Sequence, residues 1–203
     1  MLSQNGERKL SFSYDINGKH INNSSESAVT VLNLSYPLFK GWGSAKLNLY
    51  CSRFAAALKS YCRKISVSNN DSNRLPVIIN MRSAVFTSEA SLSLCFEVSQ
   101  GRNLPYRFAS VWSLKNGWPL SLIKVTGLSR RKLIEQLVLK TEERISRGLR
   151  IYYGDYKRLI HRRFNKDNWY LGDSGISIFF QPGEIAPVIE GIQVFSLEAP
   201  AQT

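Results

Sequence analysis

The first part of the chain contains short segments in which apolar and polar residues alternate. Residues 9–14 show this alternation, which is typical of a half-buried strand, and the pair Asn17-Gly18 after them is typical of a hairpin turn. Residues 29–39 form a second alternating segment. We expect it to be a strand that buries its more apolar face, made by Thr30, Leu32, Leu34 and Tyr36.

Three longer strand-like segments follow in the middle of the chain. They span residues 75–86, 90–99 and 104–114, and short polar connections join them. Short connections favour antiparallel neighbours, so these segments predict a meander.

Two segments have the apolar spacing of amphipathic helices. Residues 45–65 repeat apolar side chains every three or four positions, and Ser44 can cap this helix. Residues 129–147 show the same spacing, with Gly148 placed to end the helix. A shorter helix is expected over residues 154–164.

The last part of the chain, residues 168–197, predicts two strands around a tight turn, a proline-rich loop and a final strand. Taken together, the pattern predicts an α+β fold, an antiparallel meander sheet with two amphipathic helices packed on one face. Residues 1–26 are expected to form an N-terminal hairpin or extension. Residues 27–198 are expected to form a single domain, followed by a disordered tail at 199–203.

The composition adds charge to this picture. The chain has 203 residues and a formal net charge of +12. Such an excess attracts polyanions such as nucleic acid, anionic lipid or an anionic wall polymer, although it can also serve solubility alone. The sequence has neither an apolar run long enough for a transmembrane helix nor a signal peptide, so we expect a cytoplasmic protein as the sequence stands.

Residues with catalytic or metal-binding chemistry are sparse. The two histidines, His20 and His161, have no nucleophile elbow to partner them, and the motifs of phosphate loops and metal sites are absent from the sequence. Cys51, Cys62 and Cys95 lack metal-site spacing and are expected to be small core residues. The sequence therefore predicts a non-enzymatic protein without a cofactor, a metal site or catalytic residues, and a hydrolase is the weaker alternative.

The segment 130–166 is strongly basic and contains aromatic residues. Arg158, Arg162 and Arg163 lie among Tyr152, Tyr153, Tyr156 and Phe164. This mixture can hold a polyanion backbone while aromatic rings stack on bases or sugars. The alternative is a solvated helix face with aromatic residues in the core. On the first interpretation, the three arginines are candidates for polyanion or nucleic-acid binding.

A second candidate surface is the turn at residues 100–106. Arg102, Asn103, Pro105 and Tyr106 form a polar and aromatic group that can contact a partner. The alternative is the entry of a strand, where proline is tolerated at the first position.

Three stretches of the chain resemble the RsiV-like domain family. They are Tyr36-Pro37-Leu38-Phe39, residues 114–122, and residues 175–191 with Pro182, Glu184, Ile185, Ala186, Pro187 and Gly191. The resemblance covers roughly residues 27–198. The family includes the ectodomain of an anti-sigma factor that senses lysozyme, and domains beside some peptidoglycan deacetylases. Family relatives are often extracytoplasmic.

The resemblance implies a binding or sensor-type module, and the chain departs from the family pattern at two places. Gly183 stands where the family has an aromatic residue, and the turn Gln100-Gly101-Arg102-Asn103 keeps only one glycine of the family's loop. We expect a protein or cell-wall glycan ligand at the loops 100–106 and 182–191. Glu184 is the charged candidate in the second loop, where it is expected to accept hydrogen bonds from loop backbone. The oligomeric state is left open.

Overall fold

The computed structural model describes residues 12–23, 30–41, 43–68 and 77–197. Side chains are described for 31–41, 43–65 and 78–197. The expected disordered tail at 199–203 and the beginning of the first expected strand lie outside these residues.

A five-stranded sheet holds the first half of the chain. Its strands lie in chain order: β1 (Phe12–Asn23), β2 (Thr30–Gly41), β3 (Val77–Thr87), β4 (Ser91–Gln100) and β5 (Tyr106–Ser113). The predicted meander is confirmed, because β3, β4 and β5 pair antiparallel. One pair differs from the expected antiparallel sheet, since β2 and β3 are parallel. The long helix α1 (Ser44–Ser68) connects these two strands and returns the chain to the end where β2 began.

The expected hairpin turn at Asn17-Gly18 is not a turn. Both residues lie inside β1, which pairs antiparallel with β2 along most of its length. The register shifts between Asp15 and Lys19, so the residues between them form an irregularity within the strand. The turn-forming pair Asn17-Gly18 lies at this irregularity. Residues at a strand irregularity, like those in a turn, need a flexible backbone.

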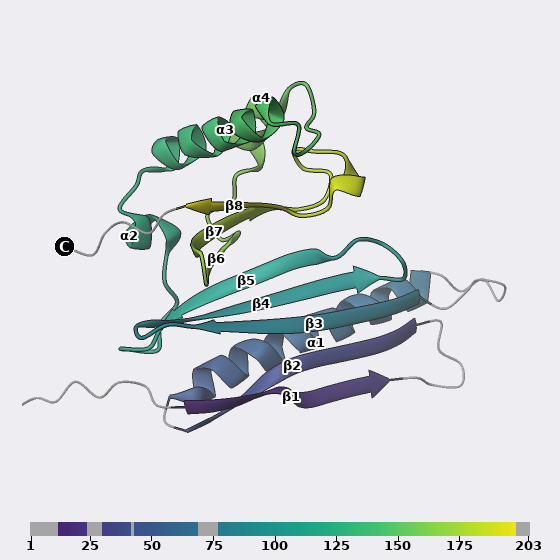
Figure 1. Cartoon of the computed structure of the whole chain (residues 1–203). Helices are drawn as coiled ribbons and strands as arrows, with labels where there is room; N and C mark the ends of the chain where they lie inside the picture. The colour runs from purple at the N-terminus through teal and green to yellow at the C-terminus, as the bar shows by residue number, and fades with distance from the viewer. Residues whose placement is uncertain (1–11, 24–29, 42, 69–76, 198–203) are drawn as a thin grey trace, which may run out of the picture.

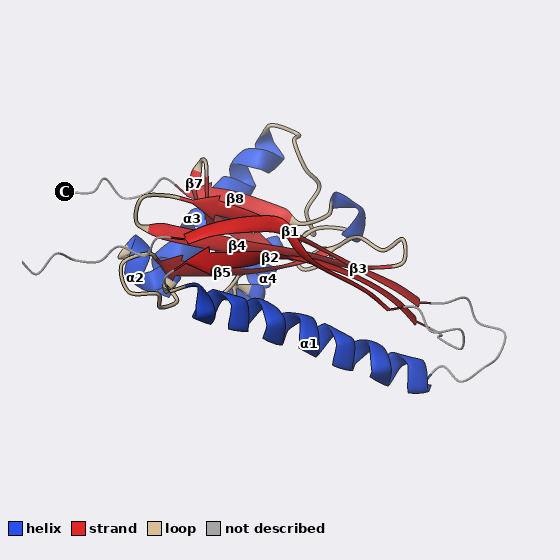
Figure 2. Ribbon diagram, turned by 90° about the horizontal axis from the view of Figure 1, so that it is seen from below, coloured by secondary structure: helices blue, strands red, loops and turns tan. Residues whose placement is uncertain are grey.

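The helix α1 covers one face of the large sheet (Figure 2). Alternate residues of the strands, among them Leu34, Met81 and Phe96, are buried against its apolar stripe. Phe54 of α1 stacks on Phe96 with ring centroids 4.7 Å apart. The expected buried face of β2 is confirmed where side chains are described, because Leu32, Leu34 and Tyr36 are all buried.

The end of the chain forms a second sheet of three antiparallel strands. These are β6 (Trp169–Gly172), β7 (Gly175–Phe180) and β8 (Gln193–Leu197), with the short helix η1 (Val188–Glu190) before β8. Three helices separate this sheet from β5 in the sequence: α2 (Leu122–Thr126), α3 (Arg130–Ser146) and α4 (Tyr156–Arg163). The small sheet lies on the face of the large sheet that is opposite to α1 (Figure 1).

The two long helices therefore lie on the outer faces of two sheets, in a sequence of layers α1, large sheet, small sheet, and α3 with α4 (Figure 1). The α+β class is confirmed, and this layering refines the expected single sheet. The layering follows from the burial of β7, because every residue of this strand from Ile176 to Phe180 is buried. A strand that is apolar on both faces needs cover on both sides, and the second core of α3, α4 and the small sheet supplies the outer cover.

The small sheet is shorter than the large one and covers only part of its face. Its first strand, β6, lies against β3, β4 and β5. The part of the same face that β2, β3 and the end of β4 make next to the turn 101–105 is open and forms a groove.

Candidate functional site

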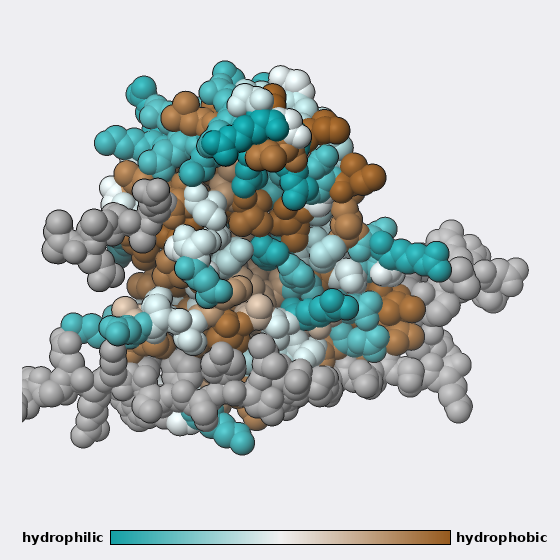
Figure 3. Space-filling model, in the orientation of Figure 1, coloured by the Kyte–Doolittle hydropathy of each residue, from teal (hydrophilic) through white to brown (hydrophobic). Residues whose placement is uncertain are grey.

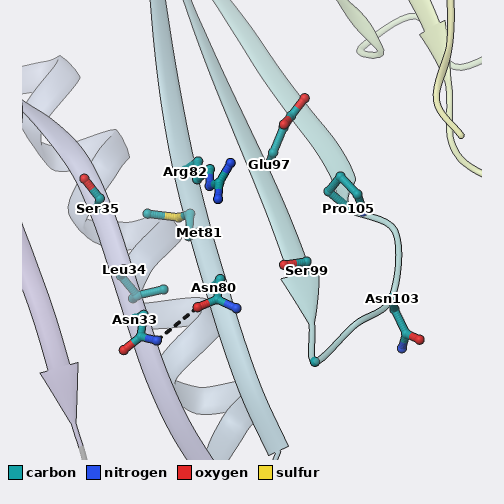
Figure 4. Close-up of a pocket in the computed structure, with 11 residues that line it drawn as sticks. Asn33, Leu34, Ser35, Asn80, Met81, Arg82, Glu97, Ser99, Asn103 and Pro105 are labelled. Atoms are coloured by element: carbon teal, nitrogen blue, oxygen red, sulfur yellow. Dashed lines mark hydrogen bonds between the residues drawn. The ribbon is translucent and has the colours of Figure 1, made fainter.

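The open part of the large sheet forms a groove with a volume of about 530 Å³. Its lining residues lie on β2, β3 and β4 and on the turn after β4, which runs along one side of the groove in Figure 4. Leu34, Met81, Gly101 and Pro105 form part of its lining, and the other lining residues are polar: Asn33, Ser35, Asn80, Arg82, Glu97, Ser99 and Asn103. These side chains offer amide, hydroxyl and charged groups to a ligand.

The strand period explains why these polar side chains meet. Neighbouring residues along a strand point to opposite faces, so the residues between the buried ones face away from α1. Asn33 lies between Leu32 and Leu34, and in the parallel pair it is opposite Asn80. The two side chains join across the strands, because Asn33 Nδ2 donates to Asn80 Oδ1 at 3.0 Å. Figure 4 shows this bond at one end of the groove.

The groove contains two charged side chains in different situations. The Glu97 carboxylate accepts two hydrogen bonds from Arg107, at 3.1 Å from Nε and 2.6 Å from Nη2. Arg107 also lies over the ring of Tyr170, 5.5 Å from its centroid, and so joins the two sheets. Arg82 is exposed, and no ion pair is found for it within the described residues. Its guanidinium is therefore available to a ligand.

The turn after β4 forms the side wall of the groove. Gly101 has a φ of 59°, which favours glycine, and its N–H donates to Ile78 O at 2.6 Å. This bond fixes the turn against β3. Of the predicted ligand residues, Asn103 and Pro105 line the groove, whereas Arg102 is exposed beside it. Tyr106 is also exposed, and the alternation of β5 places it on the α1 side of the sheet.

Glu184 lies apart from this groove, in the loop after β7. Its Oε2 accepts a hydrogen bond from the Gln181 backbone N–H at 2.7 Å, so the expected contact with loop backbone is confirmed. Burial raises the pKa of the Glu184 carboxyl above its ordinary value, while the Gln181 N–H and Arg163 act in the opposite direction. The carboxylate also lines a second pocket, which is basic.

The basic pocket has a volume of about 460 Å³. Of the three predicted polyanion-binding residues, two line this pocket and one does not. Arg162 and Arg163, at the end of α4, line it together with Arg130 and Lys166. Arg158 does not line it, and instead bonds to Asp155 on the exposed side of α4 at 2.5 Å. The pocket therefore brings together two of the three predicted arginines and adds two cations from other segments.

Exposed aliphatic side chains gather near η1. Val188 is 58% exposed and Ile189 is 88% exposed, and hydrophobic residues are visible over η1 in Figure 3. Leu149 and Ile151 are also exposed, on the segment that Arg150 joins to this loop through its 3.2 Å bond to Glu190. Exposed aliphatic residues thus lie on both of the segments that this bond joins, and Val188 and Ile189 form the apolar patch at the predicted loop 182–191.

The sequence alone did not single out most of the groove. Asn80, Arg82, Glu97 and Ser99 lie within the predicted strands, and the strand pattern alone did not mark them as ligand residues. The alternation placed Asn33 and Ser35 on the outward face of β2, which was a usable signal. The parallel pairing of β2 and β3, which brings Asn33 to Asn80, depends on the crossover through α1.

Within the described part of the chain, there is no group of three His, Cys, Asp or Glu residues that could hold a metal ion. Among the described helices, none is long and apolar enough to cross a membrane. All three cysteines are buried and free, as expected for core residues.

Comparison with known proteins supports the fold. A family model described as "Protein of unknown function (DUF3298)" matches residues 159–199, and this family is related to the RsiV-like domains. The matched stretch contains most of α4, the small sheet and the proline-rich loop. The finer RsiV-like assignment stays a prediction. No sequence among the curated proteins matches the chain.

Two solved structures are similar over nearly the whole chain. A DUF3298 family member from Bacteroides fragilis NCTC 9343 has a TM-score of 0.65 at 13% identity, with 94% of this chain and 91% of that chain covered. A DUF3298 family protein from Pseudomonas aeruginosa PAO1 has a TM-score of 0.57 at 13% identity, with 96% and 92% covered. At this identity, the similarity defines the class of fold alone.

Proposed function

We propose that this protein is a non-enzymatic binding module that holds a polar glycan strand in the groove of the large sheet. The observation that carries the proposal is the uncovered part of the sheet, where Asn33, Asn80, Ser99 and Asn103 present amide and hydroxyl groups on one surface. Such groups donate to and accept from sugar hydroxyls, and a few placed polar groups are enough to orient a ligand.

The charged residues of the groove support binding rather than catalysis. Glu97 is the carboxylate in its lining, and Arg107 holds it through two hydrogen bonds. Both hydrogen bonds go to Glu97 Oε1 and hold the carboxylate in place, so that it can accept a hydrogen bond from a ligand hydroxyl. Arg82 remains available for a carboxylate or an acetamido oxygen of the ligand. The resemblance to RsiV-like domains, some of which accompany peptidoglycan deacetylases, agrees with a cell-wall glycan.

The experiment is a calorimetric titration with soluble peptidoglycan fragments. Arg82→Ala is expected to weaken binding by about tenfold, which corresponds to the loss of one charge-assisted hydrogen bond. Arg102→Ala is the matched control, because Arg102 is exposed next to the groove without lining it. Equal weakening by both substitutions, or no saturable binding to the wild-type protein, would rule out the groove as a glycan site.

A protein ligand is the second candidate, and the apolar patch at η1 favours it. Exposed aliphatic groups of this kind are typical of protein contacts. The resemblance implies lysozyme, but the net charge of +12 disfavours so basic a partner. A pull-down with lysozyme at low and high salt tests this candidate. Specific retention that is lost on Ile189→Ser supports it, and the absence of retention at both salt concentrations removes lysozyme as the partner.

A further inference from the structure

The basic pocket is built from three separate parts of the chain. Arg130 comes from the first turn of α3, Arg162 and Arg163 come from the last turn of α4, and Lys166 comes from the loop that follows. Glu184 and the side chains of Asn165 and Asn168 complete the polar lining. The cations therefore converge through the tertiary fold and do not simply follow one helix face.

Several cations near the pocket have a carboxylate within 4 Å, whereas the four cations of the pocket have none among the described residues, and Arg163 acts on the Glu184 carboxylate from farther away. Arg131 pairs with Glu135, Lys157 with Glu142 and Arg158 with Asp155. For the four cations of the pocket, the described residues supply no ion pair within 4 Å. Four cations and one carboxylate around one hollow give a local excess of positive charge, which attracts an anion.

Arg130 is held in place without the use of a carboxylate. Its Nη2 donates to the His161 carbonyl oxygen at 2.8 Å, and its guanidinium lies 5.5 Å from the centroid of the Phe164 ring. Because the guanidinium has five N–H donors, most of them remain for a ligand. The planar group is thus oriented in advance, which lowers the entropy cost of binding.

We propose that this pocket binds a phosphate group, carried by a larger ligand or free in solution. Arginine recognises phosphate oxygens through paired N–H donors, and three arginines with one lysine can surround such a group. The proposal narrows the expected polyanion surface to one pocket, excludes Arg158 from it and adds Arg130 and Lys166. It is independent of the function proposed for the groove.

Stabilisation of helix α4 is an alternative role for some of the basic residues of the pocket. Basic residues in the last turn of a helix interact favourably with the helix dipole, which would account for Arg162 and Arg163. That role does not extend to Lys166, which lies beyond the end of α4, whereas Arg130 contacts the last turn of α4 through the His161 carbonyl. Substitution of Lys166 therefore separates phosphate binding from stabilisation of α4.

Glu184 gives the pocket an opposing charge that can be removed. Its carboxylate lies in the lining, so it repels a bound phosphate when it is ionised. Glu184→Gln removes this charge and keeps an oxygen that can accept from the Gln181 N–H. The substitution is expected to tighten phosphate binding, whereas loss of the four cations weakens it.

The test is a titration of the full chain with inorganic phosphate, followed by calorimetry or NMR at low and high salt. Arg130→Gln and Lys166→Gln are each expected to weaken binding by at least fivefold, and Glu184→Gln to strengthen it several-fold. Arg158→Gln is the matched control, with the same change of charge on α4 outside the pocket, and should alter the affinity by less than twofold. The melting temperature of each variant shows that it remains folded, since all the substituted cations are exposed.

Inorganic polyphosphate of short and long chain length forms the second arm. If short and long polyphosphate bind with equal affinity per chain end, and Arg158→Gln does not change that affinity, the pocket is a single phosphate site and the proposal is supported. Affinity that rises with chain length and falls equally with Arg158→Gln and Arg130→Gln indicates a diffuse polyanion surface and overturns it. The absence of saturable phosphate binding by the wild-type protein overturns it as well.

Discussion

Gln181 and Arg107 are joined by two hydrogen bonds that imitate the pairing of two strands. The Arg107 N–H donates to Gln181 Oε1 at 2.9 Å, and Gln181 Nε2 donates to the Arg107 carbonyl oxygen at 2.6 Å. One side-chain amide thus satisfies both backbone groups at the beginning of β5. It connects the loop after β7 to the large sheet, and therefore connects the second half of the fold to the first.

Gln181→Ala is expected to lower the free energy of unfolding by about 1–3 kcal/mol, because two hydrogen bonds are lost and two backbone groups lose their partner. Chemical denaturation measures this change. Gln136→Ala, at an exposed position of α3, is the control and should change stability by less than about 0.5 kcal/mol. Equal effects of the two substitutions would contradict a structural role for the amide.

Gly183 is expected to resist replacement for a reason that the structure makes clear. Its φ is 81°, and an added Cβ would lie 3.0 Å from Val188 Cγ2. Gly183→Ala therefore combines backbone strain of about 1–2 kcal/mol with a close contact. Gly148→Ala is the matched control, because Gly148 has a φ of 64° and no atom within 4 Å of such a Cβ.

The measurement is the difference in unfolding free energy between these two glycine variants. Gly183→Ala should be the more destabilising one. If the two variants lose the same stability, the contact with Val188 contributes nothing. The result also bears on the family pattern, since the aromatic residue expected at this position would meet the same backbone conformation.

The buried cysteines provide a prediction about pH. Burial raises the pKa of Cys51 to about 12, and burial, opposed by Arg107, raises that of Cys95 to about 12. The thiolate is the reactive form, so both thiols should resist alkylation in the folded protein at pH 8 and react only after unfolding. Mass spectrometry of the labelled protein measures this. Rapid labelling of Cys95 without unfolding would contradict its burial.

The same shifts set the sign of a stability change. Well below pH 9 both states keep the two thiols protonated, and as the pH rises through 9 the unfolded chain loses protons that the folded chain retains. The free energy of unfolding should therefore fall as pH rises from 9 towards 12. The double variant Cys51→Ala with Cys95→Ala should show a shallower fall, and an unchanged slope would argue against these shifts.

The regular elements could be predicted from the sequence because their signals are local. The periodicity of residues 45–65 and 129–147 predicted α1 and α3, and short polar connections predicted the pairing of β3, β4 and β5. The division into two sheets could not be predicted in this way. It depends on the cover that β7 needs on both faces, and that cover comes from segments distant in the sequence.

The candidate sites show the same limit. Asn103 and Pro105 were predicted as ligand residues because they lie in an expected turn, where side chains can contact a partner. Asn80 and Arg82, which lie beside them in the groove, were not predicted because they lie within strands. Arg162 and Arg163 were predicted from a run of basic residues, while Arg130 joins them only through the packing of α3 on α4. Residue type and spacing indicate which side chains have suitable chemistry, and the fold decides which of them share a site.

The central claim is that the open groove of the large sheet binds a glycan, and the most direct test is NMR of the side-chain amides during titration with soluble peptidoglycan fragments. The amide signals of Asn33, Asn80 and Asn103 should shift in a saturable manner with one common dissociation constant, while the exposed Gln136 amide on α3 should stay unchanged. Shifts that are absent from the three groove amides, or that are confined to residues around η1, would contradict the claim.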